Sequence, residues 1–66
     1  MRVTINGTSR DMGDGIDVAD LVGELTPHRR GVAVAVNGEV VPRTAWERTP
    51  LRDGDRVEVL TAAQGG

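Results

Sequence analysis

Apolar and polar residues alternate strictly over the first six positions of the chain. The apolar positions are Met1, Val3 and Ile5. A period of two is typical of a β-strand with one buried face. Asn6-Gly7 follows as a strong hairpin signal, because both residue types accept positive φ. The pattern predicts a first strand over residues 1–6 and a return strand over residues 8–12.

A helical period replaces this alternation after a glycine-rich loop at residues 13–15. Apolar residues then recur at i, i+3, i+4 and i+7, namely Val18, Leu21, Val22 and Leu25. This spacing gives a short helix one apolar face. Asp17 fits the N-cap position, and Asp20 lies in the first turn, where the helix dipole favours a carboxylate. Pro27 ends the predicted helix.

The second half of the chain returns to strand patterns rich in valine. Hairpin signals, turn residues and a proline divide it into short elements. The predicted elements are a strand over residues 32–36, a hairpin at Asn37-Gly38, a short strand over residues 39–41 ended by Pro42, one helical turn over residues 44–46, a turn over residues 51–55 and a strand over residues 56–60.

This order of elements predicts a two-layer α+β domain, because one amphipathic helix can cover one face of one mixed sheet. The first and last strands would be central neighbours, as in the β-grasp arrangement of ubiquitin. A chain of 66 residues allows one small domain. We assign that domain to residues 1–61 and a flexible C-terminal tail to residues 62–66, whose side chains are too small to bury much surface.

The predicted sheet has two unlike faces. The helix would cover Val3, Ile5, Val34, Val36, Val57 and Val59. The opposite face would carry a small apolar patch of Leu60, Ala33 and Ala35, with Glu58 pointing outward beside it. This patch lies near the tail and is either a partner contact or ordinary scattered surface. Trp46 is predicted to be a core lid over the short strand, with an interface anchor as the alternative.

Composition excludes several classes of function. The chain has no Cys and a single His, which argues against zinc sites, disulfides and a Cys nucleophile. No apolar run approaches the roughly 18 residues of a membrane span. A net charge of −2 and the absence of Phe and Tyr disfavour nucleic-acid binding. Neither a membrane segment nor a secretory signal is evident, so we expect a cytoplasmic protein.

Three polar motifs have a plain structural interpretation beside a functional one. Asp53-Gly54-Asp55 is predicted to be a turn, with metal ligation as the alternative. His28 is predicted to be a solvated loop residue, and a general base or ligand is the other possibility. Arg29-Arg30 is interpreted as a solvated pair, with partner contact as the alternative. No nucleophile–base pair is visible, so an enzyme in its own right is disfavoured.

The sequence ends in Gly65-Gly66. Two residues without a Cβ can enter a narrow tunnel as nearly bare backbone and adopt dihedrals closed to other residues. Such a tail presents one reactive group, the α-carboxylate of Gly66. A carboxylate is inert toward nucleophiles until it is activated, commonly as an acyl-adenylate. This chemistry predicts a carrier on which another enzyme acts; the alternative is a chain end without a role.

Several motifs together resemble one family. They are Asn37 at the hairpin, Val-Pro-Arg-Thr-Ala-Trp from Val41 to Trp46, Asp-Gly-Asp from Asp53 to Asp55, and the final Gly65-Gly66. The pattern resembles the ThiS sulfur carriers of thiamine biosynthesis over the whole chain. The stretch from Val41 to Trp46 is its specific part, since the other motifs also occur in the small subunit of molybdopterin synthase.

The resemblance implies a ubiquitin-like β-grasp fold and a protein cosubstrate that is not itself an enzyme and binds no cofactor. A ubiquitin-activating-type adenylyltransferase (ThiF-like) would use ATP and Mg²⁺ to adenylate Gly66. Sulfur from a persulfide would then give a thiocarboxylate that a thiazole synthase (ThiG-like) consumes. Gly65 would thread into the partner on a tether of Ala62, Ala63 and Gln64. The patch of Leu60, Ala33, Ala35 and Glu58 would contact partners.

Two alternatives to this function stay open at the level of sequence. The same carrier chemistry could serve another acceptor, such as molybdopterin or a sulfur-containing amino acid. The chain could also be a β-grasp binding module whose terminal glycines have no carrier role. We assume a monomer in each case.

Overall fold

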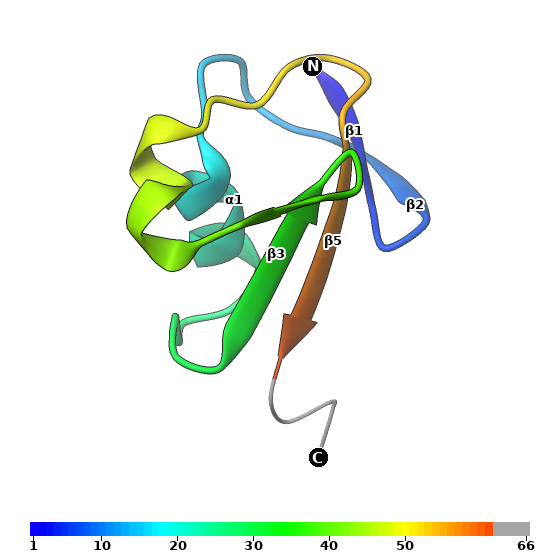
Figure 1. Ribbon diagram of the computed structural model, residues 1–66. Coiled ribbons are helices and arrows are strands. Elements are labelled where there is room, and N and C mark those ends of the chain that lie inside the picture. Colours follow the sequence, from blue (N-terminus) through cyan, green and yellow to red (C-terminus); the bar gives the residue numbers. More distant parts are fainter. Residues whose placement is uncertain (62–66) are drawn as a thin grey trace.

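Five strands form one mixed sheet in the order β2-β1-β5-β3-β4 (Figure 1). The computed structural model describes residues 1–61; the predicted tail, residues 62–66, lies outside the described residues. The elements are β1 (Arg2–Ile5), β2 (Thr8–Asp11), α1 (Val18–Leu25), β3 (Val32–Val36), β4 (Glu39–Val41), the 3₁₀ helix η1 (Arg43–Arg48) and β5 (Arg56–Thr61).

β5, the last strand in sequence, occupies the centre of the sheet. It pairs in parallel with β1 and antiparallel with β3. Two hairpins, β1–β2 and β3–β4, flank it, and each turns at an Asn-Gly pair. The predicted central pairing of the first and last strands is therefore confirmed. This sheet is the β-grasp arrangement.

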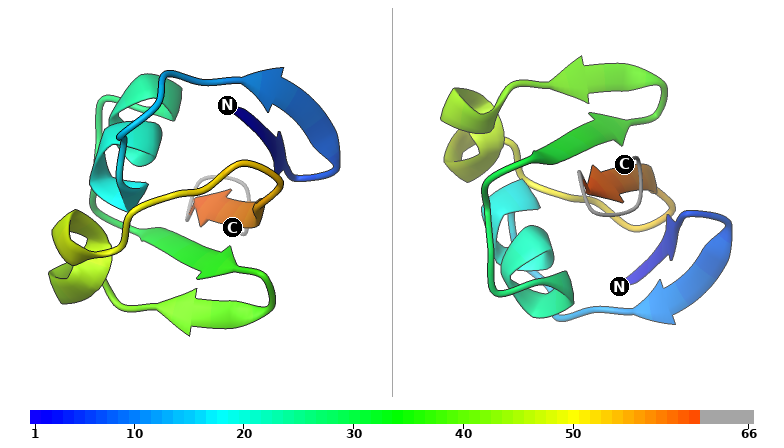
Figure 2. Two further views of the ribbon diagram at one scale, coloured as in Figure 1. Left: turned by 90° about the horizontal axis from the view of Figure 1, so that it is seen from above. Right: turned by 90° about the horizontal axis from the view of Figure 1, so that it is seen from below.

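The two helical elements lie on the same side of the sheet (Figure 2). Side chains of the sheet, α1, η1 and the loops build one core, which consists of Val3, Ile5, Met12, Val18, Leu21, Val22, Val34, Trp46, Leu51, Val57 and Val59. Most of the predicted inward positions are in this list. Val36 is only half-buried because β3 ends there. Met12 and Leu51 were expected in a strand and a turn, and both are buried loop residues instead.

Helix α1 has the bounds that its apolar spacing predicts. Asp17 is the N-cap, and its Oδ1 accepts a hydrogen bond of 2.8 Å from the backbone N–H of Asp20. The Asp20 carboxylate accepts in return from the N–H of Asp17 at 3.0 Å. This reciprocal capping box satisfies two backbone donors that a helix start otherwise leaves unpaired.

The bounds of four elements differ from the sequence prediction. β1 comprises Arg2–Ile5, whereas the pattern predicts a strand over residues 1–6. β2 stops at Asp11, one residue before the predicted end, because Met12 turns into the core. β5 continues to Thr61, which pairs with Val32. The predicted single helical turn is a six-residue 3₁₀ helix.

Trp46 of η1 is 1% exposed and packs into the core. Its Nε1 donates to the carbonyl oxygen of Val41 in β4 at 2.9 Å, so the indole N–H is paired although the ring is buried. The prediction of a core lid over the short strand is confirmed. The guanidinium of Arg29 lies 5.5 Å from the ring centroid and 3.8 Å from a Glu47 carboxylate oxygen. Arg29 is therefore only partly the solvated residue that we expected.

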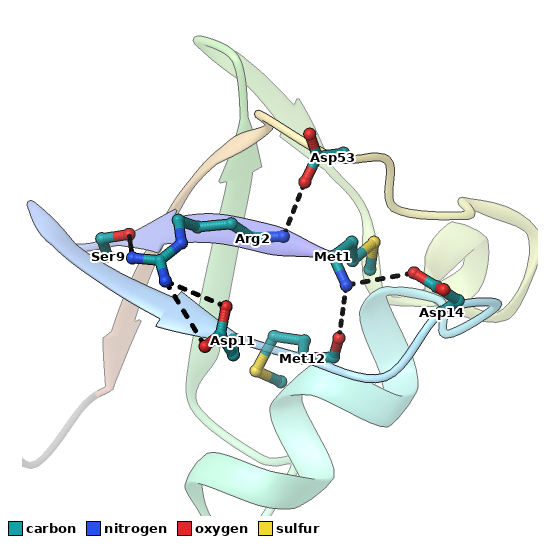
Figure 3. Close-up of polar contacts among 7 residues, drawn as sticks. All are labelled: Met1, Arg2, Ser9, Asp11, Met12, Asp14 and Asp53. Atoms are coloured by element: carbon teal, nitrogen blue, oxygen red, sulfur yellow. Dashed lines mark hydrogen bonds and ion pairs between the residues drawn. The ribbon is translucent and has the colours of Figure 1, made fainter.

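Polar contacts fasten the start of β1 to the neighbouring loops (Figure 3), at the end of the sheet away from the end of β5 (Figure 1). The backbone N–H of Arg2 donates to Asp53 Oδ1 at 2.7 Å. The Met1 ammonium donates to the Met12 carbonyl oxygen at 2.8 Å and to Asp14 Oδ1 at 3.0 Å. These contacts hold the loop before β5 against the start of β1. None of the helices in the described residues is long and apolar enough to cross a membrane.

Candidate functional site

The end of β5 is the structural platform for the predicted carrier tail. Thr61 is the last described residue, and the site residues Ala62, Ala63, Gln64, Gly65 and Gly66 lie outside the described part. Backbone pairing with β3 continues through Thr61, which is opposite Val32. The predicted tail therefore follows a strand that is paired with β3 from Val57 to Thr61.

Two asparagine side chains hold β5, one near each end. Asn6 Nδ2 donates to the Val59 carbonyl oxygen at 3.0 Å, and Asn6 Oδ1 accepts from the Val59 N–H at 2.8 Å. Near the start of β5, Asn37 Oδ1 accepts from the Arg56 N–H at 3.0 Å, and Asn37 Nδ2 donates to Asp55 Oδ1 at 3.0 Å. Sequence analysis assigned both asparagines to turns only. The contacts join residues far apart in sequence, so no local pattern indicates them.

The sheet face away from α1 carries the predicted apolar patch beside the end of β5. Cross-strand pairing sets Ala33 opposite Leu60 and Ala35 opposite Glu58. Leu60 is 65% exposed, and Glu58 is exposed beside it. All four residues of the predicted contact thus lie together on the predicted face. Whether a partner binds there stays a prediction.

Val40 extends this patch onto β4. The sequence pattern does not predict that Val40 belongs to the patch. Val40 is paired with Ala35, so both side chains face away from the helix, and it is 78% exposed. Its strand has only three residues. So short a strand gives no alternation from which a face can be read. We call the set of Ala33, Ala35, Val40 and Leu60 the open-face patch.

The same sheet face is polar over β1 and β2. The Arg2 guanidinium lies 3.3 Å from a carboxylate oxygen of Asp11 and donates to the Ser9 hydroxyl at 3.3 Å (Figure 3). Both members of the ion pair are exposed, so it contributes little to stability. The apolar part of the face is therefore confined to the half near β3, β4 and the end of β5.

The aspartates of the Asp53-Gly54-Asp55 turn have structural partners. Asp53 accepts from the Arg2 N–H, and Asp55 Oδ2 accepts from the Arg52 N–H at 2.8 Å. Gly54 has a φ of 89°, a conformation that favours glycine. Within residues 1–61, no three His, Cys, Asp or Glu side chains gather into a group that could hold a metal ion. The prediction of a turn is confirmed.

His28 and Arg30 lie exposed in the loop between α1 and β3. Thr26 Oγ1 accepts from the His28 backbone N–H at 3.2 Å, which is a local turn contact. The described residues bring no nucleophile to the imidazole.

Comparison with known proteins gives the family. A model of the ThiS family matches residues 3–66. This chain belongs to the ThiS family. The sulfur carrier protein ThiS of Thermus thermophilus is 38% identical over 64 residues, which cover 97% of this chain and 98% of the relative. The sulfur carrier protein ThiS of Escherichia coli is 29% identical over 66 residues and is covered completely, as is this chain.

A solved structure of this family has the same fold. The crystal structure of the thiamine biosynthesis protein ThiS from Geobacter metallireducens aligns with a TM-score of 0.84 at 35% identity and covers 100% of both chains. A thiazole synthase of Paramagnetospirillum magneticum is 36% identical over all 66 residues, but the chain spans only 20% of that relative. The predicted ThiS family and ubiquitin-like β-grasp fold are thereby confirmed, and the chain is a ThiS-family sulfur carrier of thiamine biosynthesis.

Proposed function

We propose that the chain carries sulfur on the carboxyl group of Gly66. An oxygen of this carboxylate attacks the α-phosphate of ATP, pyrophosphate leaves, and an acyl-adenylate forms. The terminal sulfur of a partner's persulfide then attacks the carbonyl carbon, and AMP leaves. A partner thiol cleaves the resulting S–S bond. The thiocarboxylate stays on Gly66, and the partner retains a disulfide.

The observation that carries this proposal is the extent of the ThiS match, which reaches Gly66 itself. Composition supports the same site. The chain has no Cys, and the thioethers of its two Met residues do not transfer sulfur. Within the described residues, neither a metal-binding group nor a free cysteine offers another place for the chemistry.

The reaction requires partner enzymes, because this chain supplies only the carboxyl group. We propose a ThiF-like adenylyltransferase of the ubiquitin-activating type, which binds ATP and Mg²⁺, and a thiazole synthase that takes the sulfur. The second partner is supported by the relative named thiazole synthase, which contains a segment similar to this whole chain. Three relatives of matching length, from Escherichia coli, Thermus thermophilus and Geobacter metallireducens, are named for thiamine biosynthesis or as ThiS, which favours thiazole over other acceptors.

We propose that these partners bind the open-face patch. It lies on β3, β4 and β5, the last of which leads into the tail, and Glu58 borders it. Its apolar area is small, which suits a carrier that must dissociate in every cycle. A cytoplasmic location stays a prediction from the sequence.

The proposal is tested by locating the reactive sulfur. The protein is purified from cells starved of thiamine, treated with iodoacetamide, fragmented and mapped by mass spectrometry. A thiocarboxylate is alkylated although the chain has no Cys, so we expect an adduct on the fragment that contains Gly65-Gly66. The intact mass is not sufficient, since oxidation of Met1 or Met12 adds almost the same mass as exchange of oxygen for sulfur.

A reaction reconstituted from purified components can contradict the proposal. Wild-type protein is incubated with ATP, Mg²⁺, a sulfide source and the activating enzyme, and a chain lacking Gly66 is the control. Both proteins are then treated with iodoacetamide. An adduct on the C-terminal fragment of the wild type, and none on that of the control, supports the carrier function. If no adduct forms at Gly66 under these conditions, the proposal is wrong.

A further inference from the structure

Where β1 turns away from β5, the Asn6 side chain makes the hydrogen bonds to β5 that the backbone of a longer β1 would make. The ladder between the two strands includes donation from the Thr4 N–H to the Asp55 carbonyl oxygen at 3.0 Å and from the Asn6 N–H to the Val57 carbonyl oxygen at 2.9 Å. In a continued parallel strand, the next backbone units would bond Val59. The chain instead turns back through Gly7, and the Asn6 side-chain amide bonds both the N–H and the carbonyl oxygen of Val59.

These two hydrogen bonds lie close to the point where β5 leads into the tail. Val59 is 4% exposed and lies two residues before Thr61, from which residues 62–66 continue. On the β3 side, backbone pairing continues to the end of β5. On the β1 side, the Asn6 amide continues the pairing beyond β1 itself. β5 is thus hydrogen-bonded on both sides as far as Val59, two residues before its end.

We propose that Asn6 is a positioning residue for the carrier reaction: its side chain holds the end of β5 and so aims the tail at the activating site of the partner. This role rests on the proposed function, because it gives the tail a reaction to be aimed at. Asn6 acts through Val59 and touches no reacting atom. If the end of β5 is already ordered before binding, less conformational entropy is lost when the tail enters the partner's site.

Asn37 provides a matched control inside the same molecule. It also precedes a glycine in a two-residue hairpin turn, and its φ of 51° equals that of Asn6, 50°, to within a degree. Its side chain also makes two hydrogen bonds, but these hold the start of β5. Loss of the Asn37 side chain therefore removes two comparable hydrogen bonds at the start of β5, the end from which the tail does not continue.

Glycine is the informative substitution at both positions. It tolerates positive φ at no steric cost, so Asn6→Gly and Asn37→Gly keep the turns and remove only the side-chain bonds. Asn6→Asp is the conservative variant. Aspartate also tolerates this turn, and a carboxylate oxygen can still accept from the Val59 N–H, but it cannot donate to the Val59 carbonyl oxygen.

The first measurement is amide hydrogen exchange by NMR, which does not depend on any partner. We expect Asn6→Gly to speed exchange of the Val59 N–H about tenfold more than Asn37→Gly does, as loss of one hydrogen bond predicts. Asn6→Asp should fall between Asn6→Gly and the wild type. Equal exchange of Val59 in the two glycine variants would overturn the claim that Asn6 holds the strand end.

The second measurement is ATP–pyrophosphate exchange with the activating enzyme. We expect Asn6→Gly to lower kcat between about tenfold and 100-fold, the scale of a small misplacement of a reacting group. KM should change little, because the open-face patch is intact. Asn37→Gly should retain wild-type kcat, and Asn6→Asp should recover part of it. Equal kcat for the two glycine variants would overturn the positioning role.

Failure of the proposed function has a different signature. If the wild-type chain supports no pyrophosphate exchange with an enzyme that activates another ThiS protein in the same assay, the carrier proposal is wrong, and the aiming role fails with it. The hydrogen-exchange measurement still reports whether Asn6 holds Val59 in that case. The two results together separate an error about the reaction from an error about the strand end.

Discussion

Val59 and Leu60 are consecutive in β5, but they have opposite physical roles. Val59 is 4% exposed and belongs to the core, whereas Leu60 is 65% exposed on the sheet face away from α1. Successive side chains of a strand point to opposite faces, so this contrast follows from the alternation alone. At the scale of the residue, the inward positions of β5 therefore stabilise the fold, and its outward positions form part of the surface that we propose partners bind.

Replacement of Leu60 by Arg should weaken binding to the activating enzyme. The new charge would have to be desolvated on the apolar patch that Leu60 forms with Ala33. We expect an affinity loss of about tenfold, equivalent to roughly 1.4 kcal/mol. Isothermal titration calorimetry measures the affinity, and unchanged binding would show that partners do not use this face.

Truncation of Leu60 should leave the fold intact, and truncation of the buried Leu21 provides the control. Leu60→Ala should change the free energy of unfolding by less than about 0.5 kcal/mol, as surface substitutions usually do. Leu21→Ala, at a position that is 0% exposed, should cost about 2–5 kcal/mol. Urea denaturation compares the two, and a large loss for Leu60→Ala would contradict the assignment of its face.

Trp46 should be the most costly single side chain to remove. It is fully buried and its Nε1 is bonded to Val41. Trp46→Ala should lose about 3–5 kcal/mol, whereas Trp46→Phe, which mainly removes the hydrogen bond, should lose roughly 1–3 kcal/mol. Arg29→Ala removes only the exposed cation from the ring and should cost less than about 1 kcal/mol. Circular dichroism during urea titration measures all three, and equal losses would contradict the core role of the indole.

The sequence predicted the inward side of β1, β3 and β5, because apolar residues recur at every second position of these strands. It did not predict Leu51, which is buried although its neighbours form a turn. It also missed Val40 of the open-face patch and the contacts of Asn6. Leu51 and Asn6 depend on neighbours that are distant along the chain, and Val40 lies in a strand too short to show an alternation, so the local pattern holds no signal for them.

At the scale of the element, α1 is specified by its ends as well as by its apolar face. The capping box of Asp17 and Asp20 fixes its start, and the sequence predicted this element with its observed bounds. η1 was predicted too short, since its extent follows from burial of Trp46 against the core. Elements with a local signal at each end are thus predictable, and elements shaped by tertiary packing are not.

Removal of the N-cap of α1 should be measurable against a substitution that keeps it. Asp17→Ala deprives the Asp20 N–H of its acceptor and should cost about 1 kcal/mol, within the range of roughly 0.5–2 kcal/mol for N-caps. Asp17→Ser keeps a cap oxygen and should retain most of the stability. Urea denaturation measures both variants, and equal losses would show that the carboxylate acts by something other than capping.

At the scale of the whole molecule, the core and the proposed reaction site are separate. The buried cluster extends from Val3 to Val59 in sequence, whereas the candidate reactive residue is Gly66. The sequence predicted this division, together with the central place of β5, since the order of elements restricts how one helix and one sheet can pack. The structure describes the domain but not the tail, so the tail's role rests on chemistry and on the ThiS match.

Deletion of Gly66 should accordingly abolish activation without loss of stability. The shortened chain should show the same urea midpoint as the wild type, because no core residue changes. It should show no ATP–pyrophosphate exchange above background. If a chain lacking Gly66 is still adenylated, the reactive carboxyl group has been assigned to the wrong residue.

The central place of β5 also has a consequence for how the chain folds. The hairpins β1–β2 and β3–β4 are local, but within the described sheet they are not paired with each other, and β5 lies between them. Asn6 and Val59, which bond across this junction, are 53 residues apart in sequence. The entropy of closing so long a loop must be paid before the core forms. Partial structures that lack β5 therefore gain little, and we expect both hairpins and α1 to form and melt together in one cooperative transition.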